Sequence, residues 1–315
     1  MKFDDINRNY IVVTGATGWV GRTALHELQR TLPKDIFLNH VRAFASKNSQ
    51  ISTSFYNDNS QILIYPLKEL PNFARKNKLS AIFHSAFLRR EKISSIGLIE
   101  YLNINKEINE MVTNAMKLWN DAKIVYISSG VARKYENKRN LDSMINSDPY
   151  GILKIKDEVQ IQKYRNSLVL RIYALSGRFM NEPNIFALGN FIIKAMQNEK
   201  IQITSQTPVI RSYGNASDIC KFALSWLFDE NHIKFNSPIN AVSFTIELDK
   251  LAQEVSNFFK SQGVVCNWDL RSKPNSYIAE IDTFINSLKY YGLKPKSLIE
   301  QIKDSSININ KDIFC

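Results

Sequence analysis

Short apolar runs and stretches with helical spacing alternate along the first half of the chain. The apolar runs are Tyr10–Thr14, Val41–Ala45, Gln61–Tyr65, Ala81–His84, Lys123–Ile127 and Ser167–Arg171. Helix-like stretches lie between several of these runs, notably Gly97–Trp119 and Tyr150–Lys163. Strands that alternate with helices favour a parallel sheet covered on both faces. The pattern therefore predicts an α/β fold with a doubly wound parallel sheet.

The alternation becomes irregular from about residue 172, where prolines punctuate short elements. These prolines are Pro183, Pro208, Pro238 and Pro274. We therefore expect residues 1–171 to form the sheet domain and residues 172–315 to form a smaller mixed region that covers the substrate. Some segments of this region are expected to return to the first domain.

The composition is that of an ordinary globular protein. The chain has 315 residues, of which 44% are hydrophobic and 23% are charged, so it can bury a sizeable core. No apolar run approaches the roughly 20 residues that span a bilayer. The first residues carry no signal-peptide core behind a basic start. We expect a soluble, cytoplasmic protein of one large domain or two interlocked domains.

Cysteines and charge narrow the chemistry only a little. Cys220, Cys266 and Cys315 are far apart and form no Cys-x-x-Cys pair, which favours reduced thiols and no structural metal. The 41 basic and 30 acidic residues give a net charge of +11. This charge attracts nucleic acid, anionic lipid and phosphorylated substrates alike, and a biased coding composition explains the scattered lysines equally well.

Three glycines separate the first predicted strand from the first predicted helix. The stretch VTGATGWVG places Gly15, Gly18 and Gly21 three residues apart, in a G-x-x-G-x-x-G spacing rather than the usual G-x-G-x-x-G. Glycines here let backbone amides approach a pyrophosphate, which a helix N-terminus attracts. We therefore expect a dinucleotide cofactor at this turn. The residues expected to bind it are Gly15, Thr17, Gly18, Trp19, Val20, Gly21 and Arg22.

Tyr150 and Lys154 stand four residues apart at the start of a predicted helix, directly after Asp148 and Pro149. Ser147 or Asp148 is the expected helix cap. Side chains at this spacing project from one helix face. A lysine cation there would lower the pKa of the phenol from about 10 and make Tyr150 a usable acid or base.

A pair of serines ends the strand upstream of this helix. The run KIVYISSG finishes in Ser128, Ser129 and Gly130, and the carboxyl ends of parallel strands are where ligand chemistry collects. A hydroxyl there can hydrogen-bond a substrate alcohol or carbonyl while Tyr150 moves its proton.

These motifs resemble the extended branch of the short-chain dehydrogenase/reductase superfamily, the NAD-dependent epimerase/dehydratase family. That branch begins TGATGxxG and carries Ser-Ser-x-x-Val-Tyr-Gly before its tyrosine and lysine. Further similar segments occur in the family's order: AIFHSAF, YLNINKEI, VLRIYALSGR, RSYGNASDIC and YYGLKPKSLIEQI. The resemblance implies an NAD(P)-binding Rossmann domain over residues 1–171 and a substrate-binding region over residues 172–315.

The resemblance also implies roles for single residues. Ser129, Tyr150 and Lys154 are implied to be catalytic, with Ser128 structural, and Tyr150 and Lys154 also contact the cofactor. The further cofactor-binding positions are His84, Ser85, Ala86 and Asn103, the last matching the family's structural asparagine. Ser129, Arg211 and Arg271 are implied to bind the substrate, a nucleoside-diphosphate sugar, with the two arginines on its diphosphate. Gly130–Lys134 lacks the tyrosine and glycine of the family pattern. The resemblance therefore predicts the identity of the substrate less well than it predicts the type of reaction.

The end of the second predicted strand indicates which dinucleotide binds. In this architecture a carboxylate there selects NAD, whereas this strand is followed by Ser46 and Lys47. A hydroxyl and a cation suit the 2′-phosphate of NADP, with Arg22 and Arg42 as possible assistants. We expect NADP, with NAD as the alternative.

The predicted reaction is reduction of a nucleotide-linked 4-keto sugar. Family dehydratases place Asp-Glu after the catalytic hydroxyl, and Gly130 and Val131 stand there instead. A 4-epimerase with tightly bound NAD is the first alternative, and a non-catalytic NADP- or RNA-binding protein of the same fold is the second. A reductase of non-nucleotide alcohols is disfavoured by Arg211. The resemblance also implies a homodimer that pairs the helices expected at Gly97–Trp119 and Tyr150–Lys163.

Overall fold

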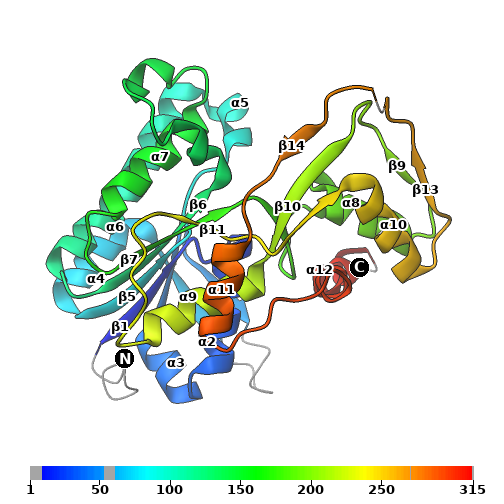
Figure 1. The fold of residues 1–315 in the computed structure, drawn as a ribbon. Helices are drawn as coiled ribbons and strands as arrows, with labels where there is room; N and C mark the ends of the chain where they lie inside the picture. The colour runs from blue at the N-terminus through cyan, green and yellow to red at the C-terminus, as the bar shows by residue number, and fades with distance from the viewer. Residues whose placement is uncertain (1–8, 53–60, 270, 314–315) are drawn as a thin grey trace. The chain divides into compact units, whose positions relative to one another are not determined.

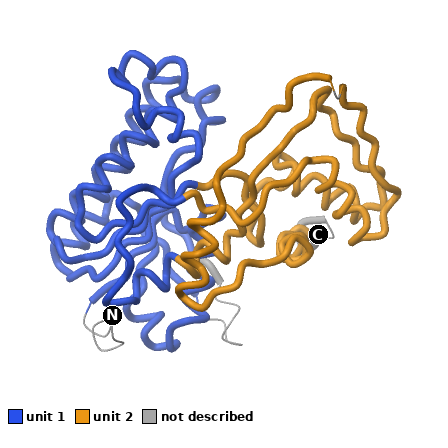
Figure 2. The backbone as a smooth tube through the Cα atoms, viewed as in Figure 1, with its two compact units in different colours: residues 1–171, 223–239 blue, residues 172–222, 240–315 orange. Residues whose placement is uncertain are grey.

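The chain divides into two compact units, shown in Figure 2. The structure is a computed structural model, and it describes residues 9–52, 61–269 and 271–313. Unit 1 comprises residues 1–171 and 223–239, and unit 2 comprises residues 172–222 and 240–315. The chain therefore leaves unit 1, enters unit 2, and returns once before it finishes in unit 2.

Unit 1 is built on one mostly parallel sheet (Figure 1). Its strands are β1 (Tyr10–Thr14), β2 (Val41–Ala45), β3 (Ser49–Ser52), β4 (Gln61–Pro66), β5 (Leu79–His84), β6 (Lys123–Ser129), β7 (Ser167–Ile172) and β11 (Ile239–Asn240). Their spatial order is β11, β7, β6, β5, β1, β2, β4, β3. The pairs β1/β2, β1/β5, β2/β4 and β5/β6 are parallel, and β3 runs antiparallel to β4. The predicted α/β fold is confirmed.

Helices flank this sheet. They are α2 (Trp19–Thr31), α3 (Lys34–His40), α4 (Leu70–Lys76), α5 (Ile93–Ile96), α6 (Leu98–Leu118) and α7 (Pro149–Ile161), and α9 (Ala216–Phe228) spans both units. The core between strands and helices includes Val12, Ile82 and Ile124 of the sheet with Val112 and Met116 of α6, all fully buried. These residues recur at strand or helical spacing, so burial of one face selects each element.

The strand order positions the site. The chain winds from β1 outward through β2 and β4, and then returns to the other side of β1 for β5, β6 and β7. At such a reversal the connections after β1 and β5 run to opposite faces, which opens a crevice at the carboxyl ends of these strands. The glycine turn follows β1, and His84 ends β5.

The returning segment 223–239 is fastened to the sheet by a buried lysine. Lys123, the first residue of β6, donates hydrogen bonds from Nζ to the carbonyl of Trp226 at 3.3 Å and to the carbonyl of Asp229. These carbonyls lie at the end of α9, where a cation is favoured by the helix dipole. Lys123 therefore caps α9 from within unit 1.

Unit 2 is a smaller mixed structure. Its strands are β8 (Ala174–Ser176), β9 (Ile201–Ile203), β10 (Val209–Asn215), β12 (Phe244–Glu247), β13 (Val264–Cys266) and β14 (Asn275–Tyr277), and its further helices are α8 (Ala187–Met196), α10 (Leu248–Phe259), α11 (Asp282–Tyr290) and α12 (Leu298–Ile313). Strand β10 pairs antiparallel with β12 and parallel with β8 and β14. Polar contacts fix α12 to β8, among them Ser176 Oγ to Gln301 Oε1 at 2.5 Å.

In the part of the chain that the structure describes, no helix is long and apolar enough to cross a membrane. Within the same residues, no group of three His, Cys, Asp or Glu side chains is placed to hold a metal. Cys220 is buried and Cys266 is half-buried, whereas Cys315 lies outside the described residues.

Candidate active site

Two of the three glycines in the turn, Gly15 and Gly21, leave no room for a side chain. Gly15 has φ +71°, and a Cβ added there would lie 2.7 Å from the backbone nitrogen of Ala86. A Cβ on Gly21 would lie 2.1 Å from the carbonyl oxygen of Gly15. Gly18, which caps α2, offers no side chain to the helix end, and the described first turn of α2 carries no carboxylate. The turn therefore fits the pyrophosphate of a dinucleotide, which needs close backbone approach and a positive helix end.

The end of β5 is fastened to the end of β1 beside this turn. His84 Nδ1 lies 2.7 Å from Thr14 Oγ1, and Ser85 Oγ donates to the Thr14 carbonyl at 2.8 Å. The backbone nitrogen of Ala86 donates to Thr14 Oγ1 at 3.4 Å. Burial, with the Lys154 charge as a smaller cause, lowers the pKa of His84 to about 3. His84 is therefore a neutral structural residue at the cofactor edge of the sheet.

The other predicted residues of the turn differ in exposure. Thr17 is exposed, Trp19 is buried, and Val20 and Arg22 are half-buried. This range of exposure is what a loop that opens into a helix produces, because successive side chains turn toward and away from the sheet.

Helix α7 carries the tyrosine and the lysine as predicted. Asp148 caps it by accepting a hydrogen bond from the backbone nitrogen of Gly151 at 3.1 Å, and Pro149 occupies the first helical turn. Tyr150 shares a side-chain hydrogen bond with Ser129, the last residue of β6. The structure therefore brings Ser129 and Tyr150 together from a strand end and a helix start.

Lys154 lies one helical turn further on and is buried, with 4% of its surface exposed. Its Nζ donates to the Tyr126 hydroxyl at 3.1 Å and to the Ile127 carbonyl at 3.0 Å. Nζ also lies 3.9 Å from the centre of the Phe87 ring. The Phe87 and Tyr150 rings pack at right angles with centroids 5.5 Å apart. A surface pair on an amphipathic helix is thereby excluded.

The pKa of Tyr150 differs from the sequence-based prediction. Burial raises the pKa of Tyr150 above its ordinary value, and the hydrogen bond from Ser129 opposes this shift. Burial also lowers the pKa of Lys154 to about 8, opposed by Asp157 and then Glu158. The predicted lowering of the Tyr150 pKa by Lys154 is therefore wrong for this structure, because the ammonium is directed at Tyr126 and Ile127 and burial of the phenol dominates.

The structural asparagine is Asn105, two positions beyond the predicted Asn103. Asn105 is buried, accepts a hydrogen bond from the Leu88 nitrogen at 2.7 Å and donates to the Tyr101 carbonyl at 3.0 Å. Asn103 is exposed. The helical period finds the right residue, since Asn105 falls on the buried stripe of α6 with Tyr101 and Val112.

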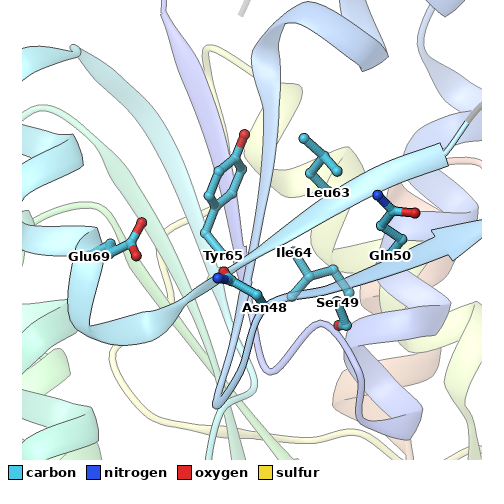
Figure 3. A pocket seen from close by; sticks show the side chains of 7 residues that line it. All are labelled: Asn48, Ser49, Gln50, Leu63, Ile64, Tyr65 and Glu69. Carbon is cyan, nitrogen blue, oxygen red and sulfur yellow. The ribbon is translucent and has the colours of Figure 1, made fainter.

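Ser46 and Lys47 follow β2 directly and are exposed. Beyond them lies a hollow, shown in Figure 3, lined by Asn48, Ser49, Gln50, Leu63, Ile64, Tyr65 and Glu69. Glu69 ends the 3-10 turn that follows β4. Sequence reasoning sought a carboxylate only at the end of β2 and missed this one, which a neighbouring strand brings to the same side of the sheet.

The two predicted diphosphate ligands lie in unit 2, whereas the predicted catalytic residues Ser129, Tyr150 and Lys154 lie in unit 1. Arg211 on β10 is half-buried and donates to the Asn275 carbonyl at 2.6 Å and to Asn275 Oδ1 at 3.1 Å. Burial lowers its pKa. Arg271 is exposed, and its backbone nitrogen bonds Asp269 Oδ1 at 3.0 Å.

Comparisons with known proteins show the family and the fold of the chain. A family model, the NAD dependent epimerase/dehydratase family, matches residues 11–236. Among solved structures, a UDP-glucose 4-epimerase from Thermotoga maritima is 17% identical, with 96% of this chain and 99% of that chain covered and a TM-score of 0.69. A UDP-N-acetylglucosamine 4-epimerase from Methanobrevibacter ruminantium is 17% identical over 97% and 99% of the chains, with a TM-score of 0.70. A dTDP-glucose 4,6-dehydratase from Bacillus anthracis is 12% identical over 96% and 97%, with a TM-score of 0.69. The search of curated proteins finds no match.

Proposed function

The chain belongs to the NAD-dependent epimerase/dehydratase family, and from this premise we propose that it epimerises a nucleoside-diphosphate sugar at the carbon that carries the reacting hydroxyl, with NAD held throughout the cycle. The observation that carries the proposal is the hydrogen-bonded pair of Ser129 and Tyr150, with the buried Lys154 one turn behind. Hydroxyl, phenol and ammonium at the carboxyl edge of a parallel sheet suit reversible oxidation of an alcohol.

The roles of the residues follow from their contacts. Ser129 holds the reacting oxygen by a hydrogen bond. Tyr150 as the phenolate accepts the hydroxyl proton when the alcohol is oxidised, and as the phenol returns that proton when the ketone is reduced. Lys154, held by Tyr126 and Ile127, places a positive charge behind that phenol. NAD, when bound, supplies the hydride acceptor. The glycine turn at Gly15 would hold its pyrophosphate.

Dehydration is disfavoured in this proposal. A family dehydratase places a carboxyl pair directly after the catalytic hydroxyl, whereas Gly130 and Val131 follow Ser129 here. Neither side chain can carry a proton to or from a leaving hydroxyl. The site is therefore equipped for proton transfer at the reacting hydroxyl alone.

A second candidate is the 4-keto-sugar reductase with exchangeable NADPH. Two observations favour it: burial keeps Tyr150 a neutral phenol, which suits proton donation to a carbonyl, and Ser46 and Lys47 suit a 2′-phosphate. Glu69 in the neighbouring hollow favours NAD, because a carboxylate repels a phosphate. The cofactor therefore separates the two candidates.

One experiment separates them directly. Purified protein is denatured to identify any retained dinucleotide, and native protein is then incubated with nucleotide sugars alone, and with 4-keto nucleotide sugars plus NADPH or NADH. Retained NAD and a new epimer without net change in nicotinamide absorbance support the epimerase. Consumption of NADPH with a keto sugar supports the reductase.

Arg211 is proposed to bind the substrate diphosphate, with Arg271 as a weaker contributor. A guanidinium is suited to phosphate oxygens because its donors form a fixed fork. Replacement of Arg211 by alanine is expected to raise the dissociation constant of a nucleoside diphosphate at least about tenfold while leaving dinucleotide affinity unchanged. If nucleoside diphosphates neither bind nor raise the melting temperature of the wild type, the nucleotide-sugar proposal fails.

A further inference from the structure

A chain of buried hydrogen bonds lies behind the catalytic lysine. The Tyr126 hydroxyl accepts from Lys154 Nζ at 3.1 Å and donates to Asp157 Oδ2 at 2.9 Å. Asp157 Oδ1 in turn accepts from Asn109 Nδ2 at 2.7 Å. Tyr126 is fully buried, and Asp157 and Asn109 are 6% and 7% exposed. The chain links the ammonium on α7 through β6 to an amide on α6.

The direction of these bonds is set by the tyrosine. Burial, with the charge of Asp157 as the next cause, raises the pKa of Tyr126 well above its ordinary value. The hydroxyl therefore stays protonated and donates a hydrogen bond to the Asp157 carboxylate. Its oxygen remains free to accept a hydrogen bond from the Lys154 ammonium. Lys154 is also held by the Ile127 carbonyl and the face of the Phe87 ring, so its position is fixed on several sides.

The neighbouring carboxylate is engaged elsewhere. Glu158 Oε1 accepts from Ser128 Oγ at 2.5 Å and from Arg171 Nε at 2.9 Å, and Oε2 accepts from Arg171 Nη2 at 2.5 Å. Asp157, by contrast, accepts its hydrogen bonds from two neutral groups among the described residues, Tyr126 and Asn109. A buried carboxylate is costly unless a positive charge balances it. Lys154, reached through the Tyr126 hydroxyl, is the cation that balances Asp157.

We propose that Tyr126 and Asp157 are positioning residues for the catalytic lysine, Asp157 keeping the buried Lys154 ammonium charged and Tyr126 holding it in place behind Tyr150. The proposal deepens the proposed function and rests on it for the role of Lys154. The proposal gives a functional reason for the buried Asp157 carboxylate, whose burial would otherwise only destabilise the fold.

The charges around Lys154 agree with this assignment. The groups that act on Lys154 are Asp157 and Glu158 of α7, Tyr126 of β6 and His84 of β5, while α6 contributes Asn109, a neutral partner of Asp157. Burial lowers the pKa of Lys154 to about 8, and Asp157 is the largest influence that opposes this shift. Burial raises the pKa of Asp157 to about 6, and Lys154 opposes that shift. At neutral pH the two groups are therefore oppositely charged, and loss of Asp157 would leave Lys154 to lose its proton near neutrality.

The test follows the lysine itself in protein without cofactor or substrate. Protein labelled with ¹³C at lysine Cε is titrated by NMR, and Lys154→Met identifies the Lys154 resonance by its disappearance. Asp157→Asn keeps the shape and the hydrogen bond from Tyr126 but removes the charge, so the titration midpoint of Lys154 should fall by about one pH unit or more. Asp142→Asn is the matched control on the same unit: it removes the exposed carboxylate that pairs with Lys156 and should leave the Lys154 midpoint in place. An unchanged midpoint in folded Asp157→Asn protein would overturn the proposal.

A second measurement tests positioning. Tyr126→Phe keeps the ring against His84 but removes the hydroxyl that joins Lys154 to Asp157. In the active enzyme each single variant should lower kcat about tenfold or more with little change in KM, and the double variant should lose little beyond either single one, as residues of one unit do. Fully additive losses would contradict a shared role. The NMR titration needs no substrate. Its result therefore remains valid even if the protein does not catalyse the proposed reaction.

Discussion

Acid should destabilise this protein through His84. The side chain is 1% exposed and its Nδ1 lies 2.7 Å from Thr14 Oγ1. Its pKa is lowered from 6.5 to about 3 by burial and then by Lys154. Between these two values the unfolded chain binds a proton at His84 and the folded protein does not. The free energy of unfolding therefore falls as pH falls, by about 1.4 kcal/mol per pH unit.

The size of the effect makes it measurable. At pH 4.5, about two units below the pKa of an unfolded histidine, the loss amounts to roughly 2.7 kcal/mol, a substantial part of the 5 to 15 kcal/mol typical of a whole domain. The contribution of His84 is isolated by measuring the free energy of unfolding in urea for the wild type and His84→Asn from pH 8 to pH 4.5. Asparagine retains a polar atom near Nδ1 for Thr14 but does not titrate.

The expected result is a convergence of the two stability curves. Above pH 6.5 they should run parallel, with the variant less stable because a smaller side chain leaves a cavity. Below pH 6.5 the wild type should lose its advantage by about 2 kcal/mol or more. Asp157, with its pKa raised to about 6, adds stability as pH falls from about 6, but it does so in both proteins. Curves that stay parallel down to pH 4.5 would refute the reasoning.

Further predictions concern single contacts. Tyr150→Phe should reduce turnover about 100-fold or more without unfolding the protein, in steady-state assays with thermal melts as the control. Asn105→Ala should cost about 1 to 3 kcal/mol in urea unfolding because the Leu88 amide loses its partner, whereas Asn103→Ala on the exposed face should cost within about 0.5 kcal/mol; equal costs would return the structural role to Asn103. Lys123→Met should cost about 1 to 3 kcal/mol, since it strips the buried end of α9 of its donor, and an unchanged urea midpoint would show that the capping bonds contribute nothing.

Local sequence patterns predicted most of the strands of the sheet and the placement of Tyr150 and Lys154 on one helix. Each apolar run became a strand because the sheet buries its apolar side chains, on both faces in β1, β5 and β6 and on one face in β4. Asp148 and Pro149 marked the start of α7 because a cap and a fixed φ are local requirements. Ser129 and Tyr150 could be paired because strand ends and helix starts meet at one edge of such a sheet.

Properties that depend on distant neighbours escaped prediction. The pKa of Tyr150 follows from burial and from Ser129, which no spacing within α7 reveals. Glu69 shares a hollow with Asn48 only because β4 lies beside β2 and β3. Asn103 was chosen by motif matching, whereas Asn105 follows from the helical stripe of α6.

The return of residues 223–239 to unit 1 has a consequence for biosynthesis. A nascent chain that has emerged as far as β7 already holds most of the sheet, but the neighbour of β7, strand β11, is translated only after residues 172–222 of unit 2. Until then the outer edge of β7 offers unpaired backbone groups, and Lys123 lacks the carbonyls of Trp226 and Asp229. Unit 1 should therefore complete its folding on the ribosome late, and a fragment cut at Arg171 should aggregate unless residues 223–239 are supplied to it.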